Sequence, residues 1–318
     1  MALTLAESAK LSTDDLQKGV LETFVQESPV LDRIPFLDIE GNAYAYNEEA
    51  TLPGVAFRNV NEAYTESTGT VNQKSEKLVI LGGDADVDRF IQQTRSDLND
   101  QRATQTAMKV KAISYKFQDT FFNGSVKTDA KSFDGLKTRL TGKQVITPNA
   151  NGIKVLGNGG TDVHTFLDAL DNLLAAVPGI NAANGAIYMN SQIMGRFRSA
   201  LRRIGYDTTL QQDINGKRTL MWNGVPVLDA GTKTDGNMVL AANETVGTAT
   251  TTTSVYAVRF GGDEGDRAVT GLTNGGVMVD DLGMLQDKPS YRTRVELYCG
   301  LAVFGGKAAA RLAGVING

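Results

Sequence analysis

Residues 84–123 read DADVDRFIQQTRSDLNDQRATQTAMKVKAISYKFQDTFFN and contain neither Gly nor Pro, in a chain that holds 34 glycines. Because Gly and Pro are the residues least compatible with a helix interior, this stretch predicts a long helix. Asp84, Asp86 and Asp88 suit its N-terminus, and Asn123-Gly124 is a typical C-terminal cap. At about 1.5 Å per residue, such a helix would be about 40–60 Å long, too long for the interior of a small domain.

The apolar residues of this stretch fall on more than one flank of the expected helix, so the helix should be packed from two sides. They are Phe90, Leu98, Met108, Val110, Ile113, Tyr115, Phe117, Phe121 and Phe122.

Residues 1–38, ahead of this helix, resemble an arm with one short helix. Leu16, Val20 and Phe24 recur at helical spacing until Pro29 ends the run. An apolar stripe on an isolated arm needs a cover, from the body of the chain or from a neighbouring subunit.

Residues 39–83 change character and predict a long projecting hairpin. Tyr44 alternates with Tyr46 and Val55 with Phe57, residues 78–81 form a strand-like apolar run, and residues 59–75 are almost entirely polar. The segment has too little apolar material for a core of its own.

The rest of the chain predicts a mixed α/β unit over residues 161–260, reached through the Gly/Asn-rich residues 149–160. Helices are expected from 161 to 178 and from 191 to 204, with a buried strand at 186–189 between them. Asn215-Gly216 and Asn223-Gly224 are hairpin signals. Further strands are expected at residues 254–260, 277–279, 291–298 and 308–315.

Composition limits the function. The chain has 318 residues, enough for two or more domains, and its net charge of −4 argues against a dedicated nucleic-acid binder. Cys299 is the only cysteine, which excludes an intrachain disulfide. We find no membrane-spanning run and no signal peptide, and so expect a protein that is made in a cytoplasm.

The residues that could carry catalysis or bind a cofactor are few. His164 is the only histidine, so paired-histidine metal sites are excluded, and Cys299 reads as a buried small hydrophobe. GNGG at residues 157–160 lacks the spacing of a phosphate-binding loop, and the acidic run at 84–88 lacks the Gly and Glu of a calcium loop. We expect no enzyme activity, no cofactor and no metal.

An arm, a hairpin, a long helix and a separate α/β unit, in this order, resemble the major capsid proteins of tailed bacteriophages, which have the Hong Kong 97-like fold. Four local segments share the resemblance: residues 121–136, 186–201, 220–228 and 294–312. It implies an α+β fold made of an N-terminal arm (1–38), an extended loop or E-loop (39–83), a peripheral domain with the spine helix (84–160), an axial domain (161–275), return strands of the peripheral domain (276–300) and a C-terminal axial strand (301–318).

The function that the resemblance implies is structural. Chains of this family self-assemble as hexamers and pentamers into an icosahedral virion capsid around double-stranded DNA, in the cytoplasm of a bacterial host. The implied partners are a separate scaffolding protein, a portal protein, the packaged DNA and a decoration protein. Two alternatives stay open: an encapsulin-type compartment shell, and an uncharacterised α/β enzyme or binding module.

Two groups of residues are candidate contacts. Arg95, Arg102, Lys109 and Lys116 recur every seven residues, so on one helix they would lie nearly on a line. This spacing has two interpretations. The four residues form an ordinary solvated face of the helix, or they form a positive stripe on the inner face of the shell that contacts DNA phosphates. The candidate contacts of the arm with a neighbouring subunit are Leu16, Val20 and Phe24.

Overall fold

The computed structural model describes residues 28–95, 101–157, 160–205, 210–212 and 218–316. Its helices are α3 (Arg89–Arg95), α4 (Gln101–Asn123), α5 (Leu136–Arg139), α6 (Gly160–Ala175) and α7 (Ser191–Arg203). Short 3-10 turns lie at Gly142–Gln144 and Glu264–Asp266.

The strands form three sheets. The first has the order β1 (Phe36–Asp38), β13 (Val269–Met284), β14 (Ser290–Val303), β4 (Val79–Asp88). The second has the order β5 (Val145–Ile146), β15 (Ala309–Ile316), β12 (Ala249–Arg259), β7 (Gly185–Met189), β10 (Val225–Asp229), β9 (Arg218–Trp222), β8 (Leu210–Gln212), with β11 (Glu244–Val246) beside β12 and β6 (Ile153–Lys154) beside β15. The third is a hairpin of β2 (Ala43–Thr51) and β3 (Thr70–Lys77).

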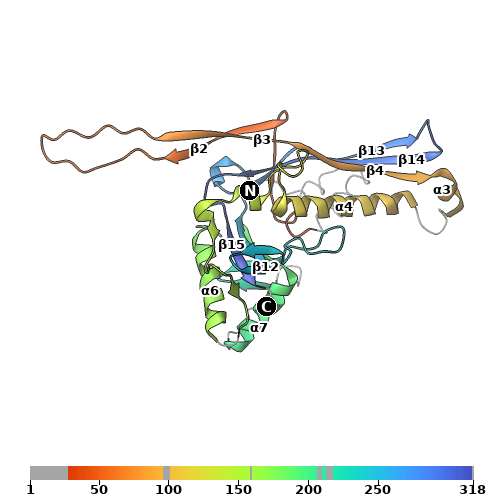
Figure 1. The fold of residues 1–318 in the computed structure, drawn as a ribbon. Helices are drawn as coiled ribbons and strands as arrows, with labels where there is room; N and C mark the ends of the chain where they lie inside the picture. Colours follow the sequence, from red (N-terminus) through yellow and green to blue (C-terminus); the bar gives the residue numbers. More distant parts are fainter. Residues whose placement is uncertain (1–27, 96–100, 158–159, 206–209, 213–217, 317–318) are drawn as a thin grey trace.

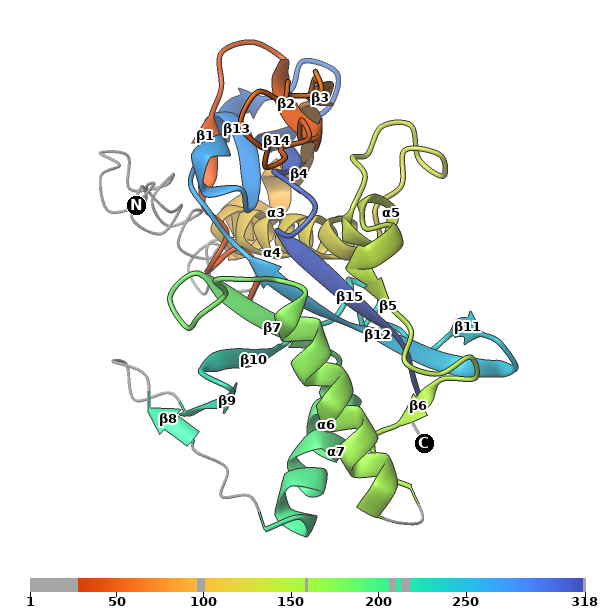
Figure 2. The same ribbon diagram turned by 90° about the vertical axis from the view of Figure 1, so that its left-hand side faces the viewer.

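The hairpin and the first sheet form one elongated layer, and the second sheet with α6 and α7 hangs below its middle (Figure 1). Helix α4 lies along one face of the first sheet, and Figure 2 looks down this layer from the hairpin end. Because β3 ends at Lys77 and β4 begins at Val79, the hairpin continues directly into the first sheet.

The expected packing of the long helix from two sides is confirmed. Val110, Ile113 and Phe117 of α4 are buried in one cluster with the apolar face of β14. At its C-terminal end, the Phe122 ring lies 5.4 Å from Tyr188 and 5.3 Å from Tyr256, both on the second sheet. The helix therefore joins the two sheets through one core.

The predicted helix start at residue 84 is wrong, because residues 84–88 are the end of strand β4. Ala85 and Val87 are buried, whereas Asp84 and Asp86 lie on the other face opposite Arg294 and Arg292 of β14. The sequence DADVD alternates with a period of two, which is the pattern of a strand. The prediction read its three aspartates as the acidic residues of a helix N-terminus instead. Helix α4 spans 23 residues, about 35 Å.

The predicted end of the long helix at Asn123-Gly124 is confirmed. The chain then folds back so tightly that a Cβ atom on Gly124 would lie 2.4 Å from the Phe133 carbonyl oxygen. The Gly135 amide donates to the Gly124 carbonyl at 2.9 Å, and the Thr138 hydroxyl donates to the same oxygen at 2.9 Å. These contacts fix α5 against the end of α4.

The hairpin differs in detail from its prediction. Its second strand is the polar segment 70–77, not the apolar run at 78–81, of which residues 79–81 begin β4. Val55 and Phe57 lie in residues 52–69, which form no strand. The error has a physical reason: the hairpin is exposed along most of its length, so no buried face imposes an alternating pattern.

The second unit agrees closely with its prediction. Helices α6 and α7 and strand β7 lie where expected, and the Asn190 side chain caps α7 by accepting from the Ile193 amide at 2.7 Å. Asn223-Gly224 joins β9 to β10, both residues having positive φ, whereas Asn215-Gly216 lies outside the described residues. The strands expected at 254–260, 277–279, 291–298 and 308–315 fall within or largely within β12, β13, β14 and β15.

Residues 28–38 are part of the body. Val30, Leu31 and Ile34 are fully buried in the core that contains α4, and the Tyr188 hydroxyl donates to the Pro29 carbonyl at 3.2 Å. Strand β1 then pairs in parallel with β13.

Candidate assembly surfaces

The most exposed apolar surface among the described residues is the outer half of the hairpin. Beyond its base, the loop 52–69 projects away from the body (Figure 1). Phe57 is fully exposed, and most of the other apolar side chains here are exposed to a similar degree: Leu52, Val55, Val60, Tyr64 and Val71. Since exposed apolar clusters of this size mark interaction sites, this loop is a candidate contact with another molecule.

A second exposed apolar group lies at the opposite end of the molecule, where β13, β14 and α3 meet (Figure 1). Its members are Phe90 and Ile91 of α3 and Leu282 and Met284 of β13. Beyond Thr273, the outer edge of β13 has no strand partner within the described ranges. The two apolar groups therefore lie at the two ends of one elongated layer.

Between these ends, the outer face of the first sheet carries a row of cross-strand ion pairs. Both oxygens of Asp84 accept from Arg294, at 2.7 and 3.0 Å, and both of Asp86 accept from Arg292, at 2.6 and 2.7 Å. Lys288 adds a third donor to Asp86 at 2.8 Å. Hydrogen bonds from these cations hold the pKa of both carboxyl groups below the usual range. This face is polar, and its charges of both signs are paired with one another.

The four basic candidate residues do not share one continuous described helix. Arg95 lies at the end of α3, and the other three lie on α4. Arg102 is paired with Asp281 at 2.6 Å, and its guanidinium lies 5.2 Å from the centre of the Tyr291 ring.

The remaining two basic residues differ in exposure. Lys109 runs alongside Gly83 of β4, with its Nζ 3.4 Å from where a Cβ atom on that glycine would stand, and Lys116 is exposed. The three basic residues on α4 therefore differ in environment: Arg102 is ion-paired, Lys109 lies against β4, and Lys116 faces solvent. The arm residues Leu16, Val20 and Phe24 lie outside the described residues.

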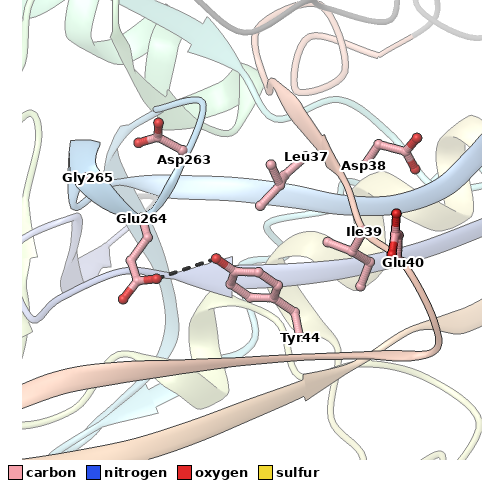
Figure 3. Close-up of a pocket in the computed structure, with 8 residues that line it drawn as sticks. All are labelled: Leu37, Asp38, Ile39, Glu40, Tyr44, Asp263, Glu264 and Gly265. Atoms are coloured by element: carbon pink, nitrogen blue, oxygen red, sulfur yellow. Dashed lines mark hydrogen bonds between the residues drawn. The ribbon is translucent and has the colours of Figure 1, made fainter.

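The cleft beside the hairpin base does not have the composition of an active site. It has a volume of about 540 Å³ and lies between the segment 37–44 and the turn at 263–265 (Figure 3). Its ionisable side chains are mostly acidic: Asp38, Glu40, Tyr44, Asp263 and Glu264. The Tyr44 hydroxyl donates to Glu264 at 3.4 Å, and partial burial and that carboxylate raise the pKa of the tyrosine. No nucleophile–base pair lines this cleft.

The other residues that could carry chemistry occupy structural positions. Cys299 is buried in the first sheet, where burial raises the pKa of its thiol to about 12, and His164 is exposed on α6. Over the described ranges, no group of His, Cys, Asp and Glu side chains is arranged to bind a metal ion. None of the helices in these ranges is long and apolar enough to cross a membrane.

Sequence reasoning missed the two exposed ends. It assigned Val55 and Phe57 to a strand, treated residues 59–75 as polar and assigned Phe90 to a packed helix face. The signal for the loop was present, because Leu52, Val55, Phe57 and Val60 are large apolar residues in a short segment and no single strand or helix period accounts for all four.

Comparisons with known proteins give a consistent picture. A family model described as major capsid protein GP7 matches residues 12–165. The SrpI encapsulin of Synechococcus elongatus has a similar structure, with a TM-score of 0.67 at 19% identity over 91% of this chain and 87% of its own.

Two capsid structures are similar as well. The capsid of the native GTA particle gives a TM-score of 0.61 at 16% identity over 91% of this chain and 90% of its own. The capsid of cyanophage A-1(L) gives 0.61 at 14% identity over 91% and 93%. A search of the curated proteins finds no match. At such identities the structural likeness concerns the fold, which it covers almost end to end.

Proposed function

We propose that this chain, whose fold is the Hong Kong 97-like fold, is a major capsid protein that assembles as hexamers and pentamers into an icosahedral shell around double-stranded phage DNA. As a component of the virion capsid its role is structural and it is not an enzyme. Assembly takes place in the cytoplasm of a bacterial host.

The observation that carries this proposal is the pair of exposed apolar groups at opposite ends of an elongated subunit. A surface at one end that contacts a different surface on the next copy is a head-to-tail interface, and such interfaces close into rings when the rotation between copies fits. The loop 52–69 is the reaching element, and the neighbouring copy is its partner. Each contact is small, so the shell is held by many of them together.

The parts of the subunit take the roles of the family. The hairpin is the E-loop, α4 is the spine helix of the peripheral domain, the second sheet with α6 and α7 is the axial domain, and residues 1–38 are the N-terminal arm. The first sheet includes the return strands of the peripheral domain. We assign Leu16, Val20 and Phe24 to contacts between the arm and a neighbouring subunit.

Basic residues of α4 contact the packaged DNA without reading its sequence. Lys116 is exposed and Lys109 is half-buried, whereas Arg102 shares its charge with Asp281, so the two lysines carry most of this contact. Phosphate contacts of this kind depend on charge alone. A separate scaffolding protein, a portal protein and a decoration protein complete the list of partners.

The test is the product formed by purified protein. We expect electron microscopy and light scattering to show capsomers and closed shells, and replacement of Phe57 and Val60 by Ser to leave soluble, folded subunits that do not close shells. A stable 34.0 kDa monomer over the whole concentration range would contradict the proposal. The matched control is Glu62→Gln, an exposed polar change in the same loop.

An encapsulin-type shell is the second candidate, favoured by the similarity to the SrpI encapsulin. The contents of particles from the native source distinguish the two. Double-stranded DNA of uniform length supports the phage capsid, and a packaged protein without a genome supports the compartment.

A further inference from the structure

The direction in which the hairpin projects from the subunit is set at the hairpin base. Strand β3 runs into β4 with only Leu78 between them, so the hairpin is a lever whose pivot is its base. Eight residues at about 3.3 Å each place Thr70 about 25 Å from the pivot. A rotation of about 10° at the base therefore moves the start of the loop by about 4 Å.

The side chain of Glu76 connects β3 to the body of the subunit through an ion pair. Seven of the eight residues of β3 are exposed, and Glu76 is the exception. Both carboxylate oxygens of Glu76 accept from the guanidinium of Arg139, the Oε2 contact at 2.6 Å. The two side chains are only 15% and 16% exposed, so solvent screens this pair far less than an ordinary surface ion pair.

The partners of Glu76 are themselves fixed. Arg139 is on α5, and its Nε donates to the Asp134 carbonyl at 2.6 Å. The Tyr46 hydroxyl, from β2, lies 3.4 Å from Glu76 and 3.4 Å from the Val303 carbonyl of β14, so it can donate to either. The Tyr46 ring packs edge-on against Phe304 at 4.9 Å. Glu76 thus connects both hairpin strands to α5 and to the first sheet.

We propose that Arg139 and Glu76 form a latch that fixes the direction of the hairpin and thereby the size and closure of the shell. This inference rests on the proposed function, in which the hairpin reaches a neighbouring copy. The two are positioning residues, since their proposed role is to hold the hairpin that reaches the neighbour. The planar fork of arginine is essential because it binds both carboxylate oxygens and so fixes an orientation, whereas lysine would fix only a distance.

The chain supplies a matched control on the same hairpin. Lys74 pairs with Glu48 at 2.5 Å, two residues further from the pivot, with side chains 48% and 23% exposed. This pair joins β3 only to β2, so it cannot fix the hairpin relative to the body. Replacing Lys74 by Gln removes an ion pair of the same type from the same strand.

The first test measures the latch in unassembled subunits. Spin labels on Thr68→Cys in the loop and Lys127→Cys in the turn after α4 report the hairpin direction, and the native Cys299 is buried. We expect a narrow distance distribution with the native latch and with Lys74→Gln. Arg139→Gln, Glu76→Gln and Arg139→Lys should lower the ratio of the population at the native distance to the population at other distances. For the glutamine variants we expect this ratio to fall by about tenfold, the factor for a lost charge-assisted hydrogen bond. Unchanged distributions in all three variants would overturn the latch.

The second test measures its consequence. If native protein and Lys74→Gln form shells of one diameter, Arg139→Gln and Glu76→Gln should give mixed diameters or open sheets, with the double variant no worse than either single one because the residues act as a pair. Native diameters in both single variants would refute the role of the latch while leaving the shell itself established. Failure of native protein to form shells would refute the proposed function instead. Arg139→Lys keeps the charge, so it remains informative if a glutamine variant does not fold.

Discussion

Glu244 is an acidic residue at the junction of the two units. Its carboxylate accepts from Lys137 of α5 at 2.7 Å, from Arg311 of β15 at 2.9 Å and from the Ser254 hydroxyl. Burial alone would raise the pKa of Glu244, but the hydrogen bonds from Lys137 and Ser254 and the charge of Arg311 outweigh it and hold the pKa below its usual range. The ionised form is therefore the one that stabilises the fold.

A pH dependence follows from this direction. A carboxyl group with a lowered folded-state pKa stabilises the protein above its unfolded-state pKa of about 4.3, and this stability is lost as the pH falls through the folded-state value. We expect Glu244→Gln to lower the free energy of unfolding at pH 7 by about 1–3 kcal/mol, discounted for partial exposure, and to have a smaller effect in acid. Thermal melts at pH 7 and pH 3 measure this. An equal loss at both pH values would contradict it; Glu66→Gln, at an exposed position of the hairpin loop, is the control.

Lys109 and Lys116 of α4 are the residues that we propose contact the packaged DNA. Changing Lys109 and Lys116 to Glu should leave empty shells intact but lower retention of the genome, most strongly at low salt, because charge repulsion is screened least there. The measurement is the fraction of full particles and their heat stability. Lys154→Glu reverses one exposed lysine on β6 and serves as the control for each single substitution. If full particles of the double variant were as numerous and as heat-stable as those of the native protein, the two lysines would be ordinary solvent-exposed residues without a role in DNA contact.

The hairpin is the element whose stability depends most on its surroundings. Residues 59–75 are exposed, and the apolar contacts that hold the hairpin lie at its base, where Tyr46 packs in a small cluster with Ile39, Leu272 and Phe304. Segments with few buried contacts open at low free-energy cost. The outer hairpin therefore lacks the packing that protects a strand in a core.

Hydrogen exchange measures this property. The amides of residues 59–75 should exchange rapidly in unassembled subunits and slowly in shells, because a neighbouring copy then covers them. The amides of β14, in the buried first sheet, provide an internal reference that stays protected in both states. Strong and equal protection of the hairpin in both states would show that it needs no neighbour.

At the scale of the whole molecule, one core joins the two sheets through α4, and the exposed surfaces that we propose as contacts between copies lie outside it. The second unit has its own core, which includes Phe166, Phe197 and Trp222. A change in the arm can therefore block assembly without unfolding that unit.

Replacing Phe24 by Asp tests this separation. An unpaired charge in an apolar contact is costly, so the variant should give few or no shells. Its α/β unit should keep its fold, as measured by the near-ultraviolet signal of Trp222, the only tryptophan. Glu22→Gln, a polar change two residues away, is the control. Shells at normal yield from Phe24→Asp protein would show that Phe24 makes no such contact.

The sequence by itself determined the features that depend on neighbours along the chain. Helix α6 and helix α7, the end of α4 at Asn123-Gly124 and the turn at Asn223-Gly224 follow from periodicity, capping and positive φ, which act within a few residues. The order of these parts was enough to suggest the family.

Only the tertiary structure decided which segments pair as strands and which charges meet. Residues 84–88 became a strand because β14 offers a ladder with arginines opposite the aspartates, and residues 70–77 became one although their side chains are polar. The pairing of Glu76 with Arg139 joins residues 63 positions apart. Strand pairing and ion pairs across the fold depend on partners that are distant in sequence, and a local pattern carries no information about those partners.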